Sequence, residues 1–227
     1  MNLSERPRLE YYFVTFIDIL GFSNMVEKDC NGPPDNVYFL PKLIDLYESM
    51  QKNRNDAGGL SFTQFSDSIV LSQRYSAEGF RDFAEQVISF QHTLLIQGVL
   101  CRGGLSYGKH YERANLLFSE ALIKAYELEN QQARYPRIVI DNDLIDLLSP
   151  RGMVPSPIIV READGALFLD YLALGTVEQN HTAVQALTVG WEQMSINIRE
   201  KLRWLREYFS FHYPENNDLS IDRFKRI

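Results

Sequence analysis

The order of hydrophobic patterns along the chain predicts an α+β fold built on a ferredoxin-like, split βαβ core (βαββαβ). Residues 11–17 form an uninterrupted aromatic and β-branched run, which is typical of a strand buried on both faces. Two further strand patterns, at residues 60–65 and 68–73, meet at a Ser-Asp turn. With a helix pattern before this pair and a helix and strand after it, the order is that of the split βαβ unit.

The two helices of the core are predicted from different signals. Pro41 is favourable in the first turn of a helix, which we expect to run to residue 52. Large apolar residues then recur in steps of three and four between Phe80 and Leu94, and Gly98 ends this second helix. Residues 99–107 follow as the fourth strand.

Beyond the core we expect a smaller set of elements and one long helix. The set comprises a helix at residues 119–130 and a strand at 137–140. A hairpin follows, with strands at 158–160 and 166–172 and a turn at Asp-Gly. Apolar residues from Leu187 to Phe209 keep a narrow helical stripe that packs on the core or on a second subunit. We expect a catalytic domain at residues 1–175, the long helix at 176–212 and a loosely held tail at 213–227.

Composition excludes several classes of function. The chain has 227 residues, a net charge of −7 and a pI near 5.2, which argues against a nucleic-acid-coating protein. Cys30 and Cys101 have no zinc-ligand spacing and are expected to be free thiols in a reducing compartment. The chain has no apolar run long enough to span a membrane and no apolar signal core, so we expect a cytoplasmic protein without a membrane partner.

Two aspartates, Asp18 and Asp67, stand where predicted strands meet turns. In the split βαβ unit the third strand lies antiparallel beside the first, so we expect these two residues to meet. Two adjacent carboxylates repel unless a cation or proton intervenes. The pair therefore predicts a site for hard divalent cations that carry a polyphosphate.

Three motifs in order carry a resemblance to a known family. They are Phe-Ile-Asp-Ile-Leu-Gly-Phe-Ser at residues 16–23, Phe-Ser-Asp-Ser-Ile-Val-Leu at 65–71 and Arg-Gly-Gly-Leu-Ser-Tyr-Gly at 102–108. Over residues 11–129 the chain resembles the class III nucleotidyl cyclases, and within them the bacterial pyrimidine cyclases of Pycsar antiphage defence. The resemblance implies a cyclase palm fold and a lyase that converts UTP or CTP to 3′,5′-cyclic UMP or CMP and pyrophosphate, as a second messenger in antiviral defence.

The resemblance also implies roles for individual residues. Asp18, Asp67 and the backbone carbonyl of Ile19 would hold two divalent ions, Mn²⁺ or Mg²⁺. Arg102 either offsets triphosphate charge or pairs with a carboxylate. The remaining candidates for contacts to the nucleotide are the turn Gly21, Phe22 and Ser23, the strand residues Phe62, Thr63 and Phe65, and Lys124.

Departures from the purine cyclases leave two readings open. Thr63 stands where those enzymes carry a base-reading Lys or Glu, and Ile123 and Glu127 stand where they carry an Asn and an Arg. The first reading is an active pyrimidine cyclase that works as a homodimer with shared sites, in which Arg102 or Lys124 of one subunit serves the metals of the other. The second is a catalytically inactive, cyclase-like domain that binds nucleotide or serves as a regulatory scaffold.

Overall fold

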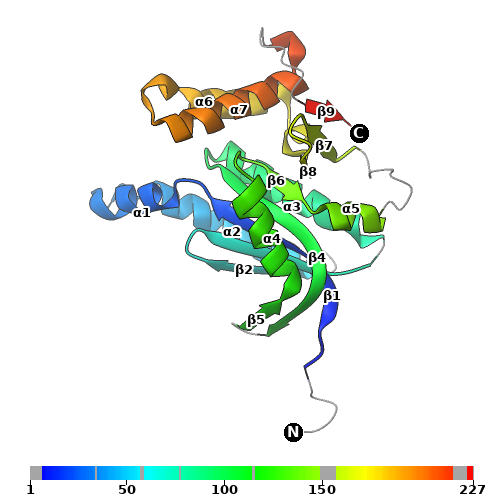
Figure 1. Ribbon diagram of the computed structural model, residues 1–227. Helices are drawn as coiled ribbons and strands as arrows, with labels where there is room; N and C mark the ends of the chain where they lie inside the picture. Colours follow the sequence, from blue (N-terminus) through cyan, green and yellow to red (C-terminus); the bar gives the residue numbers. More distant parts are fainter. Residues whose placement is uncertain are drawn as a thin grey trace.

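The protein is a mixed α/β molecule in which helices cover both faces of one sheet (Figure 1). The computed structural model describes residues 7–33, 35–56, 59–76, 78–113, 116–148, 157–216 and 224–226. No helix within these ranges is long and apolar enough to cross a membrane.

The strands form one continuous sheet in the order β2-β3-β1-β4-β6-β8-β7-β9, with β5 paired to β4. Their bounds are β1 Glu10–Ile19, β2 Ser61–Phe65, β3 Ser68–Arg74, β4 Cys101–Arg113, β5 Leu116–Ser119, β6 Ile138–Ile140, β7 Ile159–Glu162, β8 Leu167–Leu169 and β9 Phe224–Arg226. Because β3 lies antiparallel between β1 and β2, and β4 pairs with the other edge of β1, the predicted split βαβ core is confirmed.

The helices are α1 Phe22–Asn31, α2 Phe39–Asp56, α3 Gly79–Ile96, α4 Glu120–Gln132, α5 Asn142–Leu148, α6 Val177–Thr188 and α7 Ile196–His212. Side chains alternate along β1, so Phe13 and Ile17 pack in the main core with α3 while Val14 and Phe16 pack under α4. The two helices therefore lie on opposite faces. A Cβ at Gly104 would collide with the carbonyl oxygen of Ala125, so this glycine allows α4 to approach β4 closely.

The C-terminal region differs from the expected single helix, because α6 and α7 are separate elements. Gly190, which is left-handed at φ 68°, and a 3₁₀ turn at Trp191–Gln193 separate them. The apolar stripe continues through this break, which is why the sequence pattern suggested one long helix. Trp204 and Tyr208 of α7 are fully buried in the chain's own core. Within the expected loose tail, residues 224–226 form β9, which pairs with β7.

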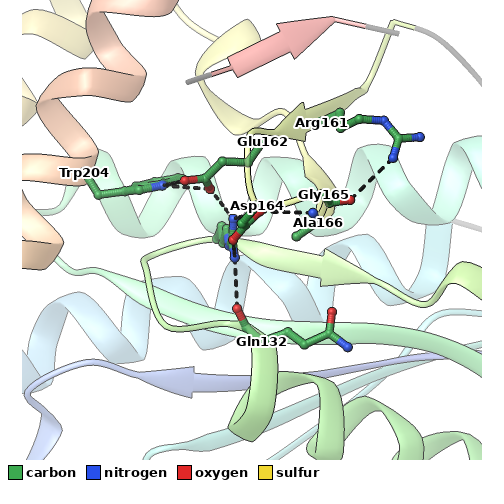
Figure 2. Close-up of polar contacts among 8 residues, drawn as sticks. Gln132, Arg161, Glu162, Asp164, Gly165, Ala166 and Trp204 are labelled. Carbon is green, nitrogen blue, oxygen red and sulfur yellow. Dashed lines mark hydrogen bonds and ion pairs between the residues drawn. The ribbon is translucent and has the colours of Figure 1, made fainter. Parts of the chain in front are cut away.

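A buried polar network joins α7 to the hairpin of β7 and β8 (Figure 2). The indole Nε1 of Trp204 donates to both carboxylate oxygens of Glu162, at 3.0 and 2.9 Å. Arg137, which is 1% exposed, pairs with Glu162 and donates to Asp164 at 2.7 Å. These contacts fix the C-terminal elements on the sheet, and so they also fix where α7 lies relative to β1 and α1.

Candidate active site

Asp18 and Asp67 lie side by side at one edge of the sheet, as the topology predicted. Asp18 is directly opposite Ser68 in the register of β1 and β3, and the Ile19 N–H donates to the Asp67 carbonyl at 2.9 Å. Both side chains are half-buried. Ser66, just before Asp67, is left-handed at φ 54°, a conformation that is uncommon outside glycine and asparagine. The tight β2–β3 turn therefore holds the backbone of Asp67 against the end of β1.

Arg102 of β4 lies opposite Asp18 on the other side of β1 and bridges two carboxylates. Its Nε donates to the Asp18 carboxylate at 3.0 Å, and its second terminal nitrogen pairs with Glu129 of α4 at 2.7 Å. The side chains of Arg102, Asp18 and Glu129 are 27%, 23% and 5% exposed. Of the two roles considered for Arg102, the structure shows the ion pair, within the same chain. Arg102 is thus engaged by two carboxylates of its own chain.

The electrostatics of this bridge centre on Glu129. Burial raises the pKa of Glu129 above its ordinary value, Arg102 opposes that rise, and the negative charge of Asp18 adds to it. Arg102 thus offsets repulsion between two carboxylates at the base of the site. Glu129 was not singled out in the sequence, where it looks like an ordinary acidic residue near a helix end. Its spacing from Ala121 and Ala125, four residues each, is the signal that it lies on the buried face.

The turn that follows Asp18 leads directly into helix α1, an element that the sequence did not reveal. Gly21 adopts the left-handed conformation at φ 77° and is the N-cap. Phe22 is half-buried against the core and Ser23 is exposed in the first turn. The first N–H groups of a helix have no partner within it, so this turn presents donors beside the two aspartates. It has the small residues and backbone geometry expected of a phosphate-approach turn.

The other predicted nucleotide contacts fall in different environments. Phe62 is 6% exposed and packs on Tyr47 and Phe90, so its prediction as a base-stacking residue is wrong: the alternation of β2 turns it into the core. Phe65 is 59% exposed at the end of β2 and remains a candidate. Lys124 of α4 pairs with Glu120 at 3.7 Å and is partly exposed.

Thr63 belongs to a polar cluster centred on Glu112, a residue that the sequence did not suggest. The Glu112 carboxylate accepts from the hydroxyls of Ser61, Thr63 and Ser72 at 2.8, 3.0 and 3.3 Å. The pKa of Glu112 is lowered to about 2, chiefly by the imidazole of His110, with the Ser61 and Thr63 hydroxyls assisting against partial burial. Strand β4 was expected to end at residue 107. Extending its two-residue period would have placed Glu112 on the same face as Arg102.

The donor set suits a metal that arrives with phosphate ligands. Within the described ranges no three His, Cys, Asp or Glu side chains are grouped to hold a metal by themselves. Mg²⁺ and Mn²⁺ are commonly held by one or two carboxylates, with phosphate oxygens and water completing the shell. Asp18 and Asp67 would provide those carboxylates, and the carbonyl of Ile19, the next residue, would be a further oxygen ligand. The residues therefore fit the two divalent ions that the sequence suggested.

Comparison with known proteins identifies the fold. No protein-family model and no curated protein matches the chain. Among solved structures, a bacterial light-regulated adenylyl cyclase matches with a TM-score of 0.51 and 15% identity, covering 80% of this chain and 100% of that chain. The adenylyl cyclase CyaB from P. aeruginosa matches with a TM-score of 0.51 and 15% identity, covering 72% of this chain and 95% of that chain. The protein therefore has the cyclase palm fold.

Proposed function

We propose that the protein is a nucleotidyl cyclase that converts UTP or CTP to the 3′,5′-cyclic monophosphate and pyrophosphate. The observation that carries the proposal is the backbone pairing that holds Asp18 beside Asp67 at the edge of a cyclase-like sheet. Two carboxylates on backbone positions this close together would repel each other unless a cation lay between them, and a site for divalent cations would explain why both are present. The fold shared with two adenylyl cyclases is consistent with this chemistry.

The reaction joins the ribose 3′-oxygen to the α-phosphorus and breaks the bond from that phosphorus to the bridging oxygen of the β-phosphate. The 3′-hydroxyl proton is released and pyrophosphate leaves. Bound divalent ions would lower the pKa of the hydroxyl and neutralise charge on the transferred and leaving groups. Asp18, Asp67 and the Ile19 carbonyl would hold these ions. Arg102 keeps Asp18 oriented, and the first N–H groups of α1 would bind phosphate oxygens.

The pyrimidine preference rests on the residues around Thr63. A short hydroxyl side chain bonded to an ionised carboxylate offers no equivalent of the longer base-reading Lys or Glu of purine cyclases. The three motifs that resemble pyrimidine cyclases support the same substrate class and a role in antiviral defence, with the enzyme in the cytoplasm.

A homodimer would complete the site. Helix α4 and the adjoining strand β5 expose large apolar side chains, namely Leu116, Phe118, Ile123 and Tyr126. Ile123 and Glu127 are both exposed on α4, and neither side chain is a cation. Ile123 and Tyr126 are three residues apart and share one face of α4, and exposed apolar side chains on one face are typical of an interaction surface. A twofold partner seated on α4 would give two equivalent sites.

An inactive nucleotide-binding domain is the second candidate. It is favoured by the positions of Ile123 and Glu127, which lack the functional groups of an Asn and an Arg. Incubating the protein with Mn²⁺ and each of the four nucleoside triphosphates, followed by mass spectrometry of the products, separates the two. The proposal expects a cyclic pyrimidine nucleotide. Tight binding of a nucleoside triphosphate with no cyclic product would identify the inactive domain instead.

A further inference from the structure

The first half of α7 lies over the turn that follows Asp18. A pocket of about 300 Å³, open to solvent, lies between this turn, α1 and α7. Its lining includes Leu20, Gly21 and Met25 on one side and Ile198, Lys201 and Leu202 on the other. Figure 1 shows the α6–α7 pair above α1. A helix distant in sequence therefore borders the candidate active site.

Lys201 is a half-buried cation at this border. Burial lowers its pKa from the ordinary value, and the positive charge of Arg102 lowers it further, whereas Glu200 and Asp18 act in the opposite direction. The ammonium group is therefore within electrostatic range of the Asp18–Arg102 pair. The Lys201 ammonium donates a hydrogen bond to the backbone carbonyl of Asn197 at 3.3 Å.

The neighbours of Lys201 on α7 are paired differently. Glu200 binds Arg134 at 2.6 Å and Arg203 binds Glu207 at 2.9 Å. No carboxylate of the described residues lies within ion-pair distance of Lys201. A half-buried cation without an ion-paired carboxylate costs desolvation energy, which the more distant charges of Glu200 and Asp18 offset only in part. Such groups are commonly found where an anionic ligand supplies the missing partner.

We propose that Lys201 binds the polyphosphate of the substrate, as a cation that α7 supplies to the active site of its own chain. The inference rests on the proposed cyclase function for the identity of the substrate. The compact, flexibly held charge of a lysine suits phosphate oxygens beside the turn at Gly21. It also supplies a positive charge, which Ile123 and Glu127 of α4 lack. The charge of Arg102 is already paired with two carboxylates. A cation beside the β- and γ-phosphates would also stabilise the negative charge that grows on the leaving pyrophosphate.

Calorimetric titration with inorganic tripolyphosphate in the presence of Mg²⁺ tests this role without requiring turnover. We expect Lys201→Met to raise the dissociation constant about 10-fold, or ~1.4 kcal/mol, and Lys201→Arg to recover most of the affinity. Arg203→Met is the matched control: it removes the same charge two residues further along α7, where the side chain is 66% exposed, and should change the constant less than about twofold. Lys201→Gln gives the same comparison if the methionine variant does not fold.

The results that would overturn the role of Lys201 differ from those that would overturn the cyclase function. If Lys201→Met or Lys201→Gln binds tripolyphosphate as the wild type does, or if the wild type does not bind it, the inference is overturned even when cyclic product forms. If binding depends on Lys201 but no nucleoside triphosphate is cyclised, the anion site stands and the cyclase proposal fails. In an active enzyme we further expect Lys201→Met to raise KM for the substrate while Arg203→Met does not.

Discussion

The Nε of Arg102 donates a hydrogen bond to the carboxylate of Asp18 across 3.0 Å, in the same chain and between adjacent strands. The same guanidinium pairs with Glu129, which is almost fully buried. One arginine thus links the first proposed metal ligand to helix α4. The strength of this link is open to direct measurement.

Replacement of Arg102 tests whether the bridge offsets carboxylate repulsion. We expect Arg102→Met to lower the free energy of unfolding by about 1–3 kcal/mol, because Glu129 keeps a buried charge without its ion partner. Adding Glu129→Gln should restore part of the loss. Urea unfolding of the wild type, both single variants and the double variant gives the coupling energy. Strictly additive losses would show that the pair contributes nothing.

The lowered pKa of Glu112 predicts that the folded protein loses stability over a specific range of acid pH. Its pKa in the folded protein is about 2, below the ordinary value of 4.5, so the unfolded chain binds more protons between these limits. The stabilising contribution of Glu112 is therefore fully present above about pH 4.5 and is lost as the pH falls towards 2. Glu112→Gln should unfold more readily at neutral pH and show a smaller loss of stability from pH 4.5 to 2. Thermal unfolding at a series of pH values checks this. Parallel curves for the two proteins would contradict it.

The exposed face of α4 predicts a dimer whose loss removes activity. We expect Ile123→Asp combined with Tyr126→Asp to shift the protein to a monomer in light scattering and to reduce turnover at least about 100-fold, because a charge in an apolar interface is costly. Leu147→Asp on α5, which likewise replaces an exposed apolar residue, is the control and should leave the mass unchanged. A wild-type monomer with full activity would refute the shared-site arrangement.

The core was predictable from sequence because its strands and α3 have strong hydrophobic periods and clear turn residues. Helix α1 was missed because it is short: Phe22, Met25 and Val26 keep helical spacing over little more than one turn, and Met25 is its one buried residue among those described. Helices α6 and α7 were merged because their apolar residues stay in register across Gly190.

The position of the candidate site was predictable from the sequence, whereas many of its side-chain contacts were not. The meeting of Asp18 and Asp67 follows from topology alone. In contrast, the contacts of Glu112, Glu129 and Lys201 depend on how distant elements pack, which no local pattern encodes. Phe62 was misassigned because its position beside a turn hides the face to which its side chain points.

The most direct test of the account compares wild type with Asp67→Asn for production of cyclic nucleotide from UTP and CTP in the presence of Mn²⁺. Asparagine keeps the size of the side chain but removes its charge, and Asp45→Asn on the exposed face of α2 is the matched control. We predict cyclic UMP or cyclic CMP with an equal amount of pyrophosphate from the wild type and from Asp45→Asn. Asp67→Asn should retain its melting temperature but lose at least about 1,000-fold in rate, which corresponds to ~4 kcal/mol of barrier. Undiminished product from Asp67→Asn, or no cyclic product from the wild type with any nucleoside triphosphate, would contradict the proposal.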